Sequence, residues 1–200
     1  MSRLRRRSAT TPLIRRHRRT TVLLTGLATT AGLTLAAAPA ASAAPPEIVS
    51  GDHYRITGGS SALAIDVESS STASDAKVVQ REVDLESRSQ AWRALRQTDG
   101  YEFRNAHSGK CLSVDEDAAD AEDFAHVVQR DCDGSAGQSW RVHAGDVDPT
   151  AGFESVLTGG FIDVPGNTRT EDTWLELQPG NGEDGNPGSS QSFYMVRVDV

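Results

Sequence analysis

The sequence has few of the residues on which metal sites, thiol enzymes and disulfide frameworks depend. Its 200 residues include only two cysteines, Cys111 and Cys132, and five histidines. Two cysteines are too few for a disulfide framework, and they lack neighbouring ligands or bases at the spacing that metal binding or thiol catalysis requires. The sequence therefore predicts no metal site and no cofactor, and it does not indicate an enzyme.

Long helices are also missing from the pattern of apolar residues. No window holds an apolar stripe at helical spacing, and the short apolar segments alternate or are β-branched, with Gly, Ser, Asp and Asn between them. This pattern predicts an all-β domain. The strands expected in its first two repeats are 54–56, 63–67, 78–80, a segment around Trp92, 101–105, 111–114, 127–130 and 140–142.

Basic residues are scarce beyond residues 1–43, which we predict to be a cleaved signal peptide. Eight arginines precede the mostly apolar, uncharged stretch 22–38, and Ala41-Ser42-Ala43 fits a cleavage site. A membrane anchor is the alternative, but the stretch is short, rich in Thr and Ala, and ends at that site. Arg18-Arg19 leaves the export route open between the general secretory and twin-arginine routes.

Cleavage after Ala43 leaves 157 residues with a strong negative charge. It removes eight of the 20 basic residues and none of the 28 acidic ones, so the remaining net charge is −16. Such a chain is not expected to bind nucleic acid or anionic membranes. We expect a secreted protein with a leader over 44–52 and a single domain over 53–200.

What the sequence does contain is one unit used three times. A phrase that begins with glutamine and ends in an aromatic residue recurs, with its glutamines 48 and 53 residues apart: Gln90-Ala91-Trp92, Gln138-Ser139-Trp140 and Gln191-Ser192-Phe193. A second phrase precedes each copy by 26 to 30 residues: Ala64–Val67, Cys111–Val114 and Phe161–Val164. Two phrases in one order and nearly one period indicate three repeats, over about 53–93, 101–142 and 153–196.

These phrases resemble the ricin-type (ricin B-like) lectin domain, a β-trefoil of three homologous subdomains with Q-x-W repeats. The resemblance covers 54 to about 196, and it is most specific over 103–112, 127–132 and 138–140. It implies a disulfide between Cys111 and Cys132, which would contribute about 3 kcal/mol by closing a short loop. It also assigns the phrase residues to the core, with their rings near a pseudo-threefold axis: Gln90, Trp92, Gln138, Trp140, Gln191 and Phe193.

In this family each subdomain can hold a shallow sugar pocket. An aspartate accepts hydrogen bonds from two hydroxyls, a ring covers the apolar face, and an amide completes the set, because sugars have polar edges and C–H faces. The resemblance carries the aspartate over to Asp66 and Asp163, whereas repeat two has Ser113. The ring and amide positions hold other residue types: Arg81, Arg130 and Gln178 for the ring, and Ser89, Gly137 and Ser190 for the amide.

Repeat three is expected to hold the best pocket, because Asn181, and Trp174 if the strand register allows it, would replace the missing amide and ring. In the alternative interpretation, Asp66 and Asp163 only bind turn amides, and Arg81 pairs with Asp66 as a structural ion pair. Sugar affinity is expected to be weak. A millimolar ligand corresponds to about −4 kcal/mol, so losing one contact worth about 1–2 kcal/mol hides binding.

An acidic segment from Asp115 to Asp123 suggests Ca²⁺. An EF-hand loop that began at Asp115 would need Gly at its sixth position and Glu at its twelfth, but Asp120 and His126 stand there. A solvated acidic loop is therefore the favoured interpretation.

The sequence as a whole predicts a secreted, non-catalytic module that binds carbohydrate on a polysaccharide or glycan. The rival is a secreted protein-binding or inhibitor trefoil whose sugar pockets have degraded. Missing rings favour the rival, and the retained Asp66 and Asp163 favour the lectin. A stand-alone enzyme ranks third, because no acid/base pair is recognisable.

Overall fold

The computed structural model describes residues 44–115 and 125–200. The predicted signal peptide and most of the acidic segment, residues 1–43 and 116–124, lie outside the described residues. Thirteen strands of the described part form one hydrogen-bonded sheet. None of the described helices has the length and apolar character needed to cross a membrane.

The strands form three sets, which extend a few residues beyond the bounds expected for the repeats. Repeat one contains β1 (His53–Gly58), β2 (Ala64–Val67), β3 (Ala76–Arg81) and β4 (Ala91–Gln97). Repeat two contains β5 (Gly100–Asn105), β6 (Cys111–Val114), β7 (Val127–Arg130) and β8 (Trp140–Ala144). Repeat three contains β9 (Ala151–Ser155), β10 (Phe161–Asp163), β11 (Thr173–Trp174), β12 (Glu176–Gln178) and β13 (Phe193–Val198).

Short 3₁₀ helices connect these strands. Three of them end at the glutamine of a Q-x-W phrase, and they are η2 (Arg88–Gln90), η4 (Ala136–Gln138) and η7 (Ser189–Gln191). The others are η1 (Glu68–Ser70), η5 (Pro165–Asn167) and η6 (Glu183–Gly185). All the strands expected from the sequence are present.

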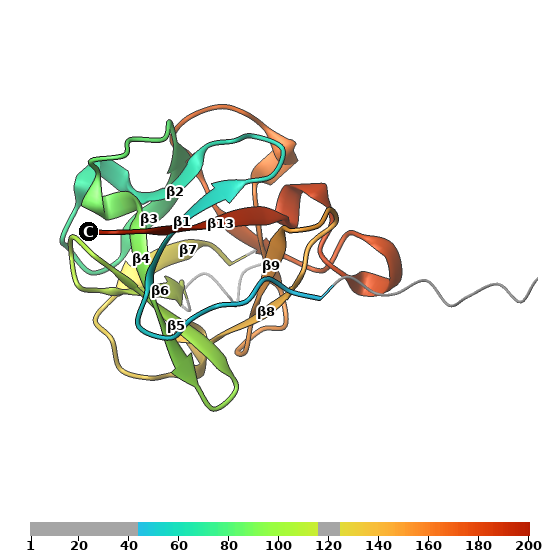
Figure 1. Ribbon diagram of the computed structural model, residues 1–200, viewed down its shortest axis with the longest axis horizontal. Coiled ribbons are helices and arrows are strands. Elements are labelled where there is room, and N and C mark those ends of the chain that lie inside the picture. The colour runs from blue at the N-terminus through green and yellow to red at the C-terminus, as the bar shows by residue number, and fades with distance from the viewer. Residues whose placement is uncertain (1–43, 116–124) are drawn as a thin grey trace, which may run out of the picture. The chain divides into compact units, whose positions relative to one another are not determined.

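Six of the strands close into a barrel. Neighbours pair in the order β1, β4, β5, β8, β9 and β13, and β13 pairs back with β1 (Figure 1). The hairpins β2–β3, β6–β7 and β10–β12 meet in a triangle, since β3 pairs with β7, β11 pairs with β3, and His126 bridges to Glu176. Closure leaves the barrel no free edge, and this is the predicted β-trefoil.

The aromatic residues of the three phrases lie in the core, as predicted. Trp92 and Trp140 are 0% exposed and Phe193 is 1% exposed. The Trp92 indole donates a hydrogen bond to the carbonyl of Ile65 (3.1 Å), and Trp140 donates to Leu112 (3.0 Å). Each indole thus bonds to the second phrase of its own repeat, which explains physically why the two phrases keep the same spacing.

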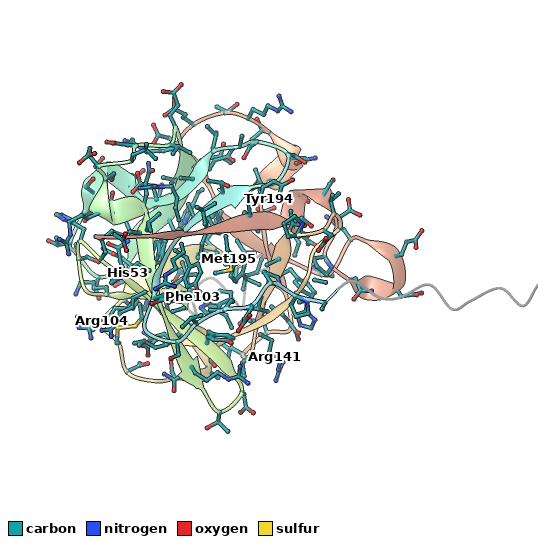
Figure 2. All side chains as sticks on the ribbon, viewed as in Figure 1. His53, Phe103, Arg104, Arg141, Tyr194 and Met195 are labelled. Atoms are coloured by element: carbon teal, nitrogen blue, oxygen red, sulfur yellow. A yellow bond between two sulfur atoms is a disulfide. The ribbon has the colours of Figure 1, made fainter. Side chains whose placement is uncertain are left out.

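Aromatic packing joins the repeats around this core. The Phe153 ring packs edge-on against Phe103 and against Phe193, with centroids 5.4 and 5.9 Å apart. Figure 2 shows Phe103 in the interior and its neighbour Arg104 at the surface, as the alternation of a strand requires.

The phrase glutamines hold the segments that precede them, which we call the Q-x-W loops (residues 82–89, 131–137 and 179–190). The side-chain oxygens of Gln90, Gln138 and Gln191 accept hydrogen bonds from the backbone amides of Asp84, Asp133 and Asn181. Their side-chain nitrogens donate to carbonyls of the same segments. All three glutamines are buried, so their predicted core role is confirmed.

A polar clasp joins repeat two to repeat one at the hairpin triangle. The buried Gln129 amide donates hydrogen bonds to the carbonyls of Ser71 (2.8 Å) and Ala73 (2.9 Å). The next residue, Arg130, forms an ion pair with Asp75. The amide fixes the loop backbone, and the guanidinium fixes the end of that loop.

The same clasp joins repeat one to repeat three. Gln80 is buried, and its amide donates to the carbonyls of Thr168 (3.0 Å) and Thr170 (2.9 Å). Arg81 forms an ion pair with Asp172 at 2.6 Å. The clasp is therefore a property of the repeated unit, which two copies retain.

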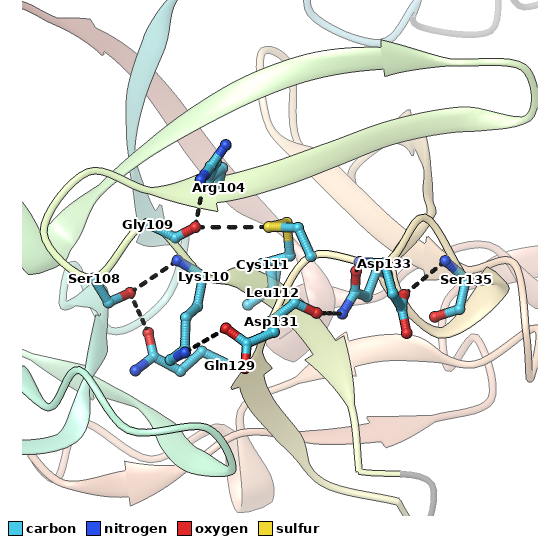
Figure 3. Close-up of a disulfide and its surroundings, with 12 residues drawn as sticks. Arg104, Ser108, Gly109, Lys110, Cys111, Leu112, Gln129, Asp131, Asp133 and Ser135 are labelled. Atoms are coloured by element: carbon cyan, nitrogen blue, oxygen red, sulfur yellow. Dashed lines mark hydrogen bonds and ion pairs between the residues drawn. A yellow bond between two sulfur atoms is a disulfide. The ribbon is translucent and has the colours of Figure 1, made fainter.

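The predicted disulfide is present within repeat two. Cys111 and Cys132 are bonded, with their Cα atoms 5.1 Å apart (Figure 3). Around it, Lys110 pairs with Asp131 at 2.6 Å, and Arg104 donates to the carbonyl of Gly109 at 2.6 Å. The bridge therefore joins two segments that polar contacts also hold together.

Candidate functional site

The two aspartates of the predicted sugar pockets occupy equivalent places. Asp66 in β2 lies opposite Val79, and Asp163 in β10 lies opposite Glu176. Each is only 4% exposed. Ser113 takes this place in repeat two, and its hydroxyl donates to the carbonyl of Val114 (3.3 Å). Two of the three repeats thus bury a carboxylate at one structural position.

Asp163 sits in a network of small polar side chains. One carboxylate oxygen, Oδ2, accepts hydrogen bonds from the Ser190 hydroxyl (2.9 Å) and from the Asn181 amide (3.3 Å). The same Asn181 amide donates to Ser190 Oγ (3.0 Å). The structure thus brings the sequence-predicted Asn181 to the carboxylate, together with a hydroxyl whose role the sequence did not indicate.

Burial governs the charge of Asp163. Loss of solvent raises the pKa of this carboxyl above its ordinary value, while hydrogen bonds from Ser190 and Gln191 act in the opposite direction. The nearby Glu176 adds a further upward push on the pKa. A hydroxyl-bearing ligand that donated to this carboxylate would stabilise its charged form.

Asn181 distinguishes repeat three from its sisters. Its backbone amide bonds to the phrase glutamine, as Asp84 and Asp133 do in repeats one and two. Those two aspartates bind their own loops, accepting from the amides of Glu86 (3.0 Å) and Ser135 (2.8 Å). An asparagine can donate to a buried carboxylate and an ionised aspartate cannot, so this loop position supplies an amide in repeat three alone.

Asp66 has different hydrogen-bond partners from Asp163. Its Oδ2 accepts from the Gln90 amide at 3.1 Å, whereas its Oδ1 is buried and has no hydrogen-bond partner among the described residues. Ser89, which stands at the family's amide position, is itself buried and bonds to the hydroxyls of Ser70 (3.2 Å) and Ser87 (2.9 Å). Repeat one therefore presents a more closed version of the site.

The positions of the family's ring hold polar residues that are engaged elsewhere. Arg81 pairs with Asp172 of repeat three, so the pair with Asp66 that the alternative interpretation included does not form. The β2–β3 register explains this, since Arg81 lies opposite Ala64 and not Asp66. The Gln178 amide donates to Glu176 Oε1 at 2.9 Å.

Trp174 belongs to the hairpin triangle. Its ring stacks on His126 with centroids 3.8 Å apart, Lys77 Nζ lies 4.5 Å from its centroid, and its indole donates to the carbonyl of Val127 (2.8 Å). Lys77, His126 and Trp174 are equivalent positions of the three repeats by strand register. Among the described residues, no hydrogen bond joins Trp174 to Asp163.

An open depression borders the Asp163 network. It has a volume of about 660 Å³ and is lined by Asn181 and Ser190, with backbone and polar groups from the neighbouring segments: Asp146, Gly182, Glu183, Gly188 and Ser189. A ligand here would meet hydroxyl, amide and carboxylate groups, which is the chemistry of sugar hydroxyls.

The described part of the chain offers one group of candidate metal ligands, Glu102 with Cys111 and Cys132. Both sulfurs are committed to the disulfide, and metal binding by cysteine requires thiolates. This group therefore does not fit a metal ion. Asp115 pairs with Arg130 at 3.0 Å, and the rest of the acidic segment lies outside the described residues.

The sequence matches the model of the ricin-type beta-trefoil lectin domain-like family over residues 47–123 and 88–178. The chain belongs to this family. None of the curated proteins compared with it matches.

Solved structures agree with this assignment. The designed three-fold symmetric protein ThreeFoil is 28% identical, with a TM-score of 0.64, and the match covers 74% of this chain and 99% of ThreeFoil. The exo-β-1,3-galactanase 1,3Gal43A from Clostridium thermocellum is 25% identical (TM-score 0.63), with coverage of 76% of this chain and 31% of the galactanase. The Macrolepiota procera ricin B-like lectin, solved with lactose, shares 18% identity and supports the fold (TM-score 0.61, coverage 76% and 99%).

Proposed function

We propose that this member of the lectin family is a secreted, non-catalytic module that binds carbohydrate through the Asp163 site of repeat three. The observation that carries the proposal is the network in which Asn181 and Ser190 bond to the buried Asp163 carboxylate beside an open depression. A carboxylate, an amide and hydroxyls are acceptors and donors suited to sugar hydroxyls. Secretion is supported by the signal-peptide pattern of residues 1–43.

Affinity is expected to be weak, because the site lacks a ring. Gln178 stands where the family places an aromatic residue, and Trp174 packs against His126 in the hairpin triangle. A sugar would therefore keep its polar contacts without the stacking of its apolar face. Binding in the millimolar range, about −4 kcal/mol, is the expected order.

A glycan array on the disulfide-bonded protein identifies the sugar, and titration of variants tests the site. Asp163→Ala removes a charged acceptor and should reduce affinity about tenfold or more. Ser113→Ala alters the equivalent position of repeat two and should leave affinity unchanged. Asp163→Asn keeps the side-chain shape and should also weaken binding.

The alternative function is binding of a protein by a trefoil whose sugar pockets have degraded. It is favoured by the polar residues at the ring positions, Arg81 and Gln178, which are engaged with Asp172 and Glu176. Unchanged glycan binding in both Asp163→Ala and Asp66→Ala would rule out the inherited sugar site and favour this alternative.

A further inference from the structure

One position on the first strand of each repeat differs in all three copies. The register fixes the equivalence, because the residue before it pairs with the aromatic residue of the Q-x-W phrase: Tyr54 with Trp92, Tyr101 with Trp140, and Ala151 with Phe193. The residues that follow are Arg55, Glu102 and Gly152. A cation, an anion and a glycine therefore occupy one structural position.

In repeats one and three the chain itself fills the space at this position. Arg55 is 6% exposed, and its guanidinium donates to the carbonyls of Asp84 (3.0 Å) and Leu85 (3.2 Å) in the Q-x-W loop. At Gly152 an added Cβ would lie 2.5 Å from Pro187 Cγ, so the proline ring already occupies that space. Neither repeat needs an external group there.

Repeat two leaves the position unfilled. Glu102 is 9% exposed, and no hydrogen bond or ion pair to its carboxylate exists among the described residues. The equivalent residue of repeat one, Arg55, is by contrast bonded to two carbonyls. Glu102 lines a depression of about 280 Å³ together with the β4–β5 turn and the Q-x-W loop, including Asp99, Gly134 and Ser135. The carboxylate lies within 4.8 Å of the Cys111 and Cys132 sulfurs, and no polar group of the described residues bonds to it at the depression.

The surroundings of Glu102 favour a positively charged occupant. Burial raises the pKa of Glu102, the charge of Asp133 raises it further, and only Arg104 lowers it. The Arg104 guanidinium is engaged with the carbonyl of Gly109. Asp133 accepts hydrogen bonds that lower its pKa, so it stays ionised, and a cation would relieve the repulsion.

The sister repeat indicates which cation. Gln138 holds the amide of Asp133 as Gln90 holds that of Asp84, so the carbonyl of Asp133 corresponds to one of the two that bind the Arg55 guanidinium. We propose that the depression beside Glu102 binds a guanidinium group, presented by an arginine side chain of a peptide or protein partner. The carboxylate adds the charged, planar acceptor that guanidinium prefers. This site is separate from the proposed sugar site.

Two small probes test the proposal on the disulfide-bonded protein. Nα-acetyl-arginine amide should shift the backbone NMR signals of Glu102 and Ser135, whereas the citrulline analogue, which has the same shape and no charge, should bind at least about tenfold more weakly. Equal binding of the two probes would overturn the proposal. So would tighter binding of Nα-acetyl-lysine amide, because it would indicate a site for a point charge.

Variants locate the binding. Glu102→Gln should weaken the arginine probe at least about tenfold, and Glu102→Arg should abolish binding by placing the protein's own guanidinium in the depression, as in repeat one. Asp163→Ala is the control, and it should bind the probe as the wild type does. Undiminished binding of the arginine probe in Glu102→Gln would contradict the proposal. The sugar titration uses a different ligand and a different residue, so a failure of this proposal can be told apart from a failure of the proposed sugar site.

Discussion

In the hairpin triangle, two repeats make the same bonds, whereas the first-strand position beside each Q-x-W loop holds a different residue in every repeat. Gln80 and Gln129 each donate to two carbonyls of a neighbouring loop. At the loops, the equivalent first-strand positions hold Arg55, Glu102 and Gly152. Contacts that are repeated with one geometry serve the scaffold. Positions where equivalent residues diverge do not have this structural role, and Glu102 and Asn181 of the two candidate sites stand at such positions.

Only two of the three repeats carry the clasp residues of the hairpin triangle. The residue equivalent to Gln80 and Gln129 in repeat three is Leu177, which lies opposite Ile162 as Gln80 lies opposite Ile65. It is followed by Gln178 where the others have arginine. Repeat three therefore carries neither the amide nor the guanidinium of the clasp, and its third strand is split at Leu175 into β11 and β12.

The largest expected effect tests the scaffold shared by both regions. Trp140 is fully buried and its indole bonds to Leu112, so Trp140→Ala should lower the free energy of unfolding by about 3–5 kcal/mol as a large core truncation. Denaturant titration followed by circular dichroism measures it. The control Leu85→Ala, at a side chain 75% exposed, should change stability by about 0.5 kcal/mol or less. Similar losses in the two variants would contradict the core assignment.

The second-largest loss of stability is expected when the amide of one clasp is removed. Gln129→Leu introduces the residue that repeat three has at this position and removes the bonds to Ser71 and Ala73. Two carbonyls and the Ser108 hydroxyl lose their partner, so unfolding free energy should fall by about 1–3 kcal/mol. Hydrogen exchange should rise in the loop 71–75.

The matched control for that clasp is Gln178→Ala, because the side chain of this glutamine bonds only to the side chain of Glu176 among the described residues. It should change stability by about 0.5 kcal/mol or less. If Gln129→Leu were as mild as Gln178→Ala, the clasp would not hold the two repeats together.

The fold was predictable because its signals are local and repeated. Trp92 and Trp140 bond to Ile65 and Leu112 at fixed separations along the chain, so their spacing shows in the sequence. The pair between Arg81 and Asp172 spans 91 residues and depends on which repeats become neighbours. No spacing rule reveals such a contact, and the alternative interpretation therefore paired Arg81 with Asp66 instead.

The candidate site was predictable in part for a similar reason. Asp66 and Asp163 are each the third residue of the second phrase, and Asn181 lies in the segment that the phrase glutamine holds. Ser190 was considered only as a failed amide, although its hydroxyl reaches Asp163. The sequence around Glu102, taken alone, does not mark it as a site residue. Glu102 becomes visible when the three first strands are aligned and compared with Arg55.

A third prediction uses pH to test the burial of Asp163. Burial raises the folded-state pKa of Asp163, so the folded protein binds this proton more readily than the unfolded chain. Its contribution to stability is present at low pH and is lost as pH rises through the folded pKa. The unfolding free energy of the wild type relative to Asp163→Asn should therefore fall as pH rises from acidic to neutral, by about 1 kcal/mol or less. A difference independent of pH would show that Asp163 is not desolvated.

The smallest effect compares the two arginines of the clasps. Arg81 is 34% exposed and pairs with Asp172, which is 55% exposed, so Arg81→Gln should lower stability by about 0.2–1 kcal/mol, and less at high salt. Arg130 is 22% exposed and binds both Asp75 and Asp115, so Arg130→Gln should lower it more. Removing a guanidinium that binds two carboxylates should cost more stability than removing one exposed ion pair. Thermal unfolding of both variants at low and high salt ranks the two losses. A greater loss in Arg81→Gln would show that the clasp between repeats one and three depends on its ion pair more than the other does.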